Sequence, residues 1–355
     1  MINYLFMVVL VLIALASLPL WWMAIQRVRC SPGSLPSNAL LPPRQQIESP
    51  IGLFDVLLTF LFWTVLQAVC VLFILQVMDL DQADLAGPAA TQSISLYAVM
   101  AAGQLLTILL TLAWIALRYR HVLQIFGCSS RFFATDLKLA TCAFVMTVPG
   151  LLLLQWLFRF LVDYRHGTIE ILKDQNNLLT VLVTWTAAVV LAPLAEEKFF
   201  RGFLQSWLQR MGHGQHRISA SRLFLGGFSG IPQTPGTLPL DNQNVALADK
   251  VDNPYRPSGG DIAPNERQTA EHPLVLVHSQ TGWMPIILTS AAFGAVHLGQ
   301  GLAPLILFLF SIVLGFLYRQ TGSILLCIVL HMLLNGYSMF WVTLDLFLGS
   351  SSNSL

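Results

Sequence analysis

Eight long apolar stretches constrain this chain most, because each approaches the length that a helix needs to cross a lipid bilayer. They cover about residues 2–25, 51–78, 93–117, 139–162, 178–196, 283–298, 302–318 and 323–346. A hydrocarbon core of about 30 Å needs about 20 apolar residues in helical form. The sixth and seventh stretches are short and are separated only by Gly299-Gln-Gly301, so we expect them to be tilted or partly re-entrant. The pattern predicts an all-α, polytopic membrane protein with about eight transmembrane helices.

The composition agrees with a membrane protein and excludes several other classes. Hydrophobic residues make up 55% of the chain and charged residues only 10%, whereas a soluble domain carries about 25% charged residues. The net charge of +1 gives no indication of nucleic-acid binding. The five cysteines include no Cys-x-x-Cys pair, and this indicates neither a disulfide framework nor a zinc site. The expected surroundings are the lipid bilayer.

The distribution of lysine and arginine predicts the orientation, because positively charged loops stay in the cytoplasm. These residues follow the first, third, fifth and seventh stretches: Arg27, Arg29 and Arg44; Arg118, Arg120, Arg131 and Lys138; Lys198, Arg201, Arg210, Arg217 and Arg222; and Arg319. The loop after the second stretch carries three aspartates and no cation. We therefore expect a multi-pass protein of the cell (inner) membrane with both termini outside.

The first stretch has two interpretations. Ala14-Leu-Ala16 resembles a signal-peptide cleavage site, but no basic residue precedes the apolar run, which continues past Ala16 to Trp22. We expect an uncleaved membrane anchor.

A polar segment at about residues 212–280 interrupts the apolar pattern. It is rich in Gly, Pro, Asn, Asp and Gln, and such a composition buries too little apolar surface to order itself. We predict a flexible cytoplasmic insertion. The predicted organisation is an N-terminal membrane region (1–175, about four spans), a second membrane domain (176–346) that contains the insertion, and a short tail (347–355).

Three polar pairs lie in or beside the last apolar stretches. Glu196-Glu197-Lys-Phe-Phe-Arg201 stands at the end of the fifth stretch, so we expect it near the cytoplasmic face. Residues four apart share a helix face, and this spacing joins Glu197 to Arg201, Phe293 to His297 and His331 to Asn335. Taken singly, the charges could be an interfacial cluster, His331 a helix contact and Phe293 a core residue. Together they could converge on one pocket suited to general base catalysis with oxyanion stabilisation.

These motifs resemble the signature of the CPBP intramembrane proteases, also called the Abi or CAAX protease and bacteriocin-processing family. The signature is Glu-Glu-x-x-x-Arg, Phe-x-x-x-His and His-x-x-x-Asn, and Gly315-Phe-Leu-Tyr-Arg-Gln-Thr-Gly-Ser also resembles the family's approach to its last helix. The resemblance covers about residues 178–211 and 283–346. The separation of the first two motifs is long for the family, and the polar insertion accounts for it.

The resemblance implies hydrolysis of a peptide bond in a membrane-associated or prenylated (CAAX-like) protein or peptide. Glu196 with His297 would activate water, and His331 with Asn335 would stabilise the oxyanion. Glu197 with Arg201 would support them, and Phe293 would bind substrate or give packing support. No cofactor is favoured, although zinc is possible. A metal-dependent enzyme would use Glu196, His297 and His331 as ligands.

Other classes are weaker candidates. Gly227-Phe-Ser-Gly230 matches the rhomboid serine motif but lies in the polar insertion. The chain has no Gly-x-Gly-Asp and no His-Glu-x-x-His, and their absence argues against aspartyl and site-2 zinc proteases. A non-catalytic scaffold or immunity protein and a solute transporter remain as alternatives. Transport fits poorly, because the strong polar groups concentrate in the C-terminal half.

Overall fold

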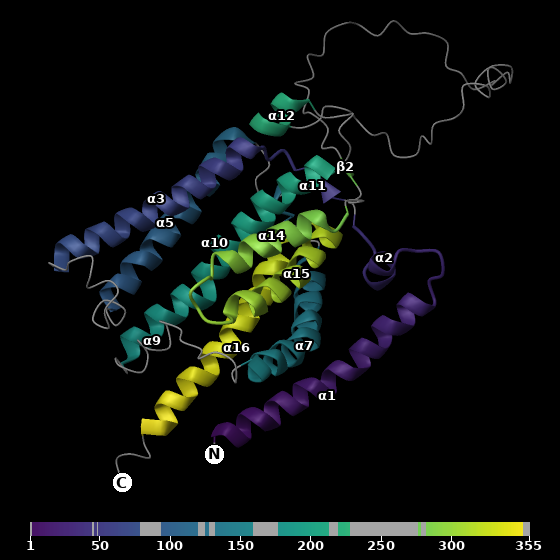
Figure 1. The fold of residues 1–355 in the computed structure, drawn as a ribbon, viewed down its shortest axis with the longest axis horizontal. Helices are drawn as coiled ribbons and strands as arrows, with labels where there is room; N and C mark the ends of the chain where they lie inside the picture. Colours follow the sequence, from purple (N-terminus) through teal and green to yellow (C-terminus); the bar gives the residue numbers. More distant parts are fainter. Residues whose placement is uncertain are drawn as a thin grey trace, which may run out of the picture.

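The protein is a bundle of long apolar helices (Figure 1). The computed structural model describes residues 2–44, 46–47, 49–78, 94–119, 125–127, 132–158, 177–212, 219–227, 276–277 and 282–350. Within them, 7 helices are long and apolar enough to cross a membrane. They are α1 (Ile2–Arg29), α3 (Leu53–Met78), α5 (Ile94–Arg118), α7 (Phe133–Phe158), the run Leu178–Gly212, α15 (Ala303–Thr321) and α16 (Ile324–Ser350). The predicted all-α, polytopic fold is confirmed.

The helix that carries the Glu-Glu pair is longer than its apolar stretch. It runs without a break through α9 (Leu178–Trp185), the π-helix η3 (Thr186–Leu191), α10 (Ala192–Glu197), the π-helix η4 (Lys198–Gln205) and α11 (Ser206–Gly212). Its polar second half is buried and forms hydrogen bonds with other segments: Gln205 Nε2, for example, donates to the Gly315 carbonyl (2.8 Å). Glu196 therefore lies near the middle of a 35-residue helix, which continues well past the end of the predicted apolar stretch. Its position near the cytoplasmic face stays a prediction.

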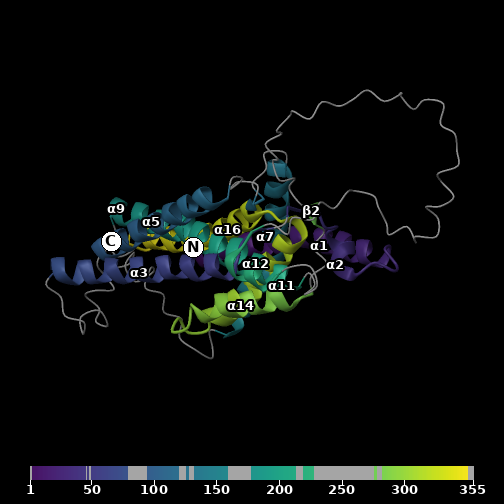
Figure 2. The same cartoon turned by 90° about the horizontal axis from the view of Figure 1, so that it is seen from above.

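The sixth predicted span forms half of a hairpin. Helix α14 (Met284–Ala295) has 12 residues, or about 18 Å at 1.5 Å per residue, too little to cross a bilayer core alone. It packs against α15. Strand β2 (Leu276–Val277), which precedes α14, pairs with β1 (Gln46–Ile47), and Gln46 donates to the Arg319 carbonyl at the end of α15 (2.7 Å). The hairpin thus begins and ends at one end of the bundle. Figure 2 shows α14 along one edge, with α5 and α9 along the opposite edge.

The segments that follow α1, α5, α11 and α15 gather at one end of the bundle. Three contacts demonstrate this: Arg44 Nη1 lies 2.6 Å from Asp136 Oδ1, Gly227 N donates to Pro50 O (2.7 Å), and Ser323 Oγ donates to Asp136 Oδ2 (2.6 Å). The start of α1 and the end of α16 lie at the opposite end (Figure 1). This arrangement agrees with the predicted alternation of loops. Which end faces the cytoplasm stays a prediction, as does the domain division.

Two pieces of the predicted polar insertion are part of the bundle's surface. Helix α12 (Ala220–Leu225) packs against α3 and α11, and β2 pairs with β1. The short helix α2 (Pro36–Leu40) lies near the same end, where Gln320 Nε2 donates to Ser37 O (2.9 Å). The rest of the insertion, including most of the Gly-x-Ser-Gly sequence, lies outside the described residues, and so does its predicted flexibility.

Candidate active site

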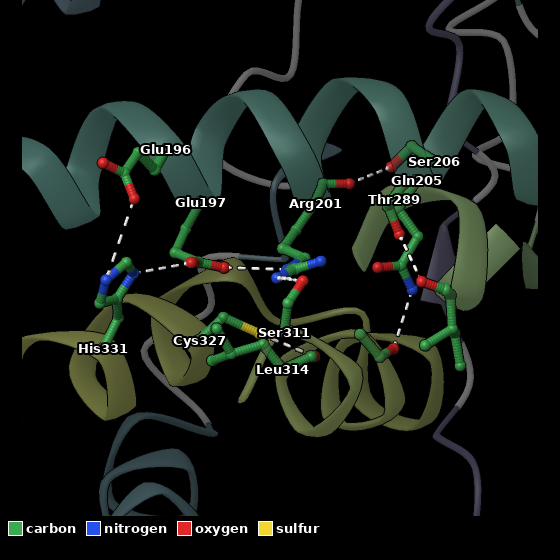
Figure 3. A network of polar contacts seen from close by, with 12 residues as sticks. Glu196, Glu197, Arg201, Gln205, Ser206, Thr289, Ser311, Leu314, Cys327 and His331 are labelled. Carbon is green, nitrogen blue, oxygen red and sulfur yellow. Dashed lines mark hydrogen bonds and ion pairs between the residues drawn. The ribbon is translucent and has the colours of Figure 1, made fainter. Parts of the chain in front are cut away.

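A chain of polar contacts runs through the middle of the bundle (Figure 3). Arg201 Nε donates to Glu197 Oε2 at 3.0 Å, and Arg201 Nη2 donates to Ser311 Oγ of α15 at 2.9 Å. Both members of the Glu197–Arg201 pair are 0% exposed. The i, i+4 pair predicted from the sequence is therefore present, and it lies where water does not screen it.

His331 connects this pair to the second carboxylate. Its Nδ1 lies 2.8 Å from Glu197 Oε1, and its Nε2 lies 3.9 Å from Glu196 Oε2. The first distance is a hydrogen bond, whereas the second is too long for one. The buried carboxylate thus fixes the imidazole of His331, and the other ring nitrogen is directed toward Glu196.

Four of the predicted residues line one cavity of about 400 Å³: Glu196, His297, His331 and Asn335. Glu197 and Arg201 are not among its lining residues. Adjacent residues on a helix are rotated by about 100°, so Glu196 faces the cavity while Glu197 points into the protein. The side chain of Glu196 is 13% exposed and that of Glu197 is 0% exposed. The structure separates the two carboxylates by environment.

His297 stands in the turn that follows α14, and its ring orientation is set by the preceding helix. Nδ1 lies 2.8 Å from the carbonyl oxygen of Phe293. A carbonyl can only accept, so Nδ1 carries the proton in this contact. Nε2 of the neutral ring is then an acceptor, a form suited to taking a proton from water.

Asn335 is oriented by a backbone carbonyl that a nearby proline leaves without its usual helical hydrogen bond. Asn335 Nδ2 donates to Ala188 O in η3 at 2.8 Å. In the π-helical register of η3, the amide of Ala192 bonds to Ala187 O, and the next amide would bond to Ala188 O. Residue 193 is proline and has no N–H. The freed carbonyl takes one Nδ2 hydrogen of Asn335, and the second hydrogen remains for a ligand.

Phe293 lies behind the cavity. It is 0% exposed and does not line the cavity. Its ring centroid lies 5.2 Å from that of His297 and 5.8 Å from that of His331, and the Arg201 guanidinium lies over its face at 5.6 Å. Of the two roles that the sequence left open, this position fits packing support.

Sequence reasoning missed two contributors to the site. Ser311 binds Arg201, and the only signal for it is a hydroxyl in an apolar stretch. The Ala188 carbonyl has no side-chain signal, although Pro193 five residues later is visible in the sequence.

The arrangement of these residues also bears on metal binding. Across the described part of the chain, no three His, Cys, Asp or Glu residues form a group that could hold a metal ion. One ring nitrogen of His331 and one of His297 already have protein partners. The expectation of no resident cofactor, with zinc as the alternative, stays a prediction.

Fold and site together define a polytopic helical membrane protein with a polar cavity in the middle of its bundle. Residues 178–238 and 273–337 match the family described as Type II CAAX prenyl endopeptidase Rce1-like. The match confirms the resemblance to the CAAX protease family and supports a CAAX-type intramembrane endopeptidase in general. Its two ranges carry all three sequence motifs and are separated by part of the polar insertion. No curated protein and no solved structure matches the chain.

Proposed function

We propose that the protein is an endopeptidase that hydrolyses a peptide bond of a membrane-associated or prenylated (CAAX-like) substrate within the membrane. One observation supports this most strongly: Glu196, His297, His331 and Asn335 line the same cavity. Hydrolysis needs a base for water and donors for the oxyanion, and these four side chains supply both. A membrane-associated substrate agrees with the apolar helices and the family match.

The proposed reaction begins with water in the cavity beside Glu196 and His297. Glu196 carboxylate, assisted by Nε2 of His297, accepts a proton as the water oxygen bonds to the substrate carbonyl carbon. The carbonyl oxygen becomes an oxyanion, to which Asn335 Nδ2–H donates. His331 also donates to it from Nε2 as an imidazolium, the form in which both ring nitrogens carry a proton and Nδ1–H donates to the Glu197 carboxylate. The oxyanion then re-forms the carbonyl, the C–N bond breaks, and the proton held by the base passes to the leaving amine.

Glu197 and Arg201 are positioning residues in this proposal. Glu197 holds His331 by Nδ1, and Arg201 holds Glu197. Both lie outside the cavity lining, so neither touches the substrate.

Cleavage by the purified protein in lipid bilayers tests the proposal. A prenylated peptide ending in cysteine, two aliphatic residues and serine serves as the substrate. Glu196→Ala and His297→Ala should abolish cleavage, whereas Asp345→Asn, which alters an exposed carboxylate of α16 outside the cavity, should not. Full activity of the two site variants would overturn the mechanism. Loss of wild-type activity on chelation, restored by zinc, would favour the metal-dependent alternative. A wild-type protein that cleaves no membrane substrate would favour the scaffold or transporter alternatives.

The active-site face is also proposed as cytoplasmic. An accessibility test with a cysteine introduced at Ser221 of α12 should give labelling by an impermeant reagent only after the membrane is opened. Labelling of intact cells would reverse the orientation.

A further inference from the structure

The cavity extends beyond the residues of the family signature. Its wall includes Gln67 of α3, Gln104 of α5 and Gln155 of α7. These helices lie outside the ranges that match the family. The N-terminal helices thus complete a cavity that the matched region leaves open.

Apart from the hydroxyl of Tyr97, the rest of this wall is apolar. Met100 and Ala101 lie beside Gln104 on α5, and Leu151 and Leu152 lie beside Gln155 on α7. A primary amide in a membrane-spanning helix is costly unless it finds a partner. Among the residues that the structure describes, Gln104 and Gln155 form no hydrogen bond, and Gln67 has a long contact of 3.5 Å to Met100 O.

A peptide drawn into this cavity brings its own unsatisfied groups. Each residue of an extended substrate exposes one N–H and one C=O, and the bilayer offers no water to bind them. A primary amide carries two donors and an acceptor, so one glutamine can bond both groups of a peptide unit. A wall made only for a prenyl or acyl chain would need no amides.

We infer that Gln104 and Gln155 are substrate-binding residues that hydrogen-bond the peptide backbone beside the scissile bond. The inference rests on the proposed function, because it assumes that a peptide occupies the cavity of Glu196 and His297. It adds that α5 and α7 help to select the substrate by backbone hydrogen bonding, independently of the prenyl group.

Binding to an inactive protein separates this inference from the catalytic proposal. The background is full-length Glu196→Gln in lipid nanodiscs, and the probe is the fluorescent form of the same prenylated peptide. Gln104→Leu and Gln155→Leu keep similar volume but remove the amide, and each should raise Kd about fivefold, the effect of one net hydrogen bond. Gln76→Leu is the matched control, since Gln76 is an exposed glutamine of α3 outside the cavity lining.

A second set of probes identifies which backbone amide of the peptide bonds to the glutamines. Each carries one N-methyl group on a backbone amide, which removes a single donor. On the reference protein, at least one methylated probe should bind about fivefold more weakly than the parent probe. On the leucine variant that lacks the glutamine partner, the same methylated probe and the parent should bind equally well.

Unchanged or tighter probe binding in both leucine variants overturns the inference, and tighter binding would mean that the wall holds the prenyl chain. Failure of the reference protein to bind any probe also counts against it. If the probe binds with these differences but the wild-type protein never cleaves it, the proposed function fails while the binding role stands.

Discussion

Two buried clusters of charge, one in the N-terminal helices and one in the C-terminal bundle, differ in what their polar atoms have left to bind. In the first, Asp55 of α3 accepts from Gly52 N, Trp114 Nε1 and Tyr119 Oη at 2.9, 3.0 and 2.9 Å, and lies 3.0 Å from Arg118 Nη1. Asp55 is 0% exposed and lines no part of the cavity. Its contact with Gly52 also caps the first turn of α3.

In the second cluster, around Glu196 and Glu197, the two carboxylates differ in their partners. Glu197 is satisfied by Arg201 and His331, but among the described residues the cavity-facing Glu196 has only the 3.9 Å approach of His331. A buried charge alone therefore does not indicate chemistry, because protein partners can satisfy it fully, as at Asp55. The functional signal is an acceptor or donor that faces a cavity and has no partner within bonding distance.

The largest expected effect separates activity from stability at Glu196. Glu196→Gln should reduce kcat roughly 10³-fold, about 4 kcal/mol in the activation free energy, since it removes the proposed base. The thermal midpoint should change little, because Glu196 forms no direct hydrogen bond with any residue that the structure describes. Steady-state cleavage and thermal unfolding in the same nanodiscs measure both. A large fall in the midpoint would mean that Glu196 is structural like Asp55.

Glu197→Gln should act mainly on stability. It leaves the Arg201 guanidinium buried without its carboxylate, and breaking such a pair costs about 3 kcal/mol. Denaturation in mixed micelles measures the loss. In Glu197→Gln with Arg201→Met, much of the stability should return because the unpaired charge is gone, although cleavage should stay impaired. If stability does not recover in the double variant, the unpaired charge of Arg201 is not the cause of the loss.

Asp55→Asn should cost about 2 kcal/mol of stability, the scale of hydrogen bonds to a charged group. The loss is smaller than at Glu197 because the side chain of Arg118 is 23% exposed and reaches solvent. The kcat of the folded fraction should equal that of the wild type. If fully folded Asp55→Asn had a lower kcat than the wild type, the Asp55 cluster would also contribute to catalysis, and the two clusters would not differ in this respect.

The fold class and the meeting of the motif residues were predictable from the sequence. Membrane-spanning helices follow from the length and apolarity of the stretches alone. The meeting of Glu197, Arg201 and His331 follows from i, i+4 spacing and the family resemblance, since neither needs tertiary detail.

Three features could not be predicted, because they depend on contacts between distant segments: the length of the helix that carries Glu197, the orientation of Asn335 and the N-terminal wall of the cavity. The helix continues past Glu197 because Gly315 and Ile51 supply carbonyls to Gln205 and Arg210, and hydropathy cannot report such partners. The orientation of Asn335 depends on the π register around Ala188, which Pro193 permits but does not predict. The N-terminal wall with Gln104 appears only when α5 packs beside η3 and α10.

The smallest expected effect concerns Tyr119, which lies just beyond the α5 span. Burial, together with the neighbouring Asp55 carboxylate, raises the pKa of Tyr119 well above its usual value of about 10. Below pH 10 the phenol is protonated in both the folded and unfolded states, so its hydrogen bond to Asp55 contributes fully, and Tyr119→Phe should cost about 1 kcal/mol. Above pH 10 the unfolded state loses its proton first, and the wild type loses stability that the phenylalanine variant keeps. Denaturation at pH 8 and pH 11 should show the gap between the two proteins narrowing. A gap that is constant or widens with pH would mean that Tyr119 does not donate to Asp55, and that the Asp55 cluster is less fully satisfied than its contacts indicate.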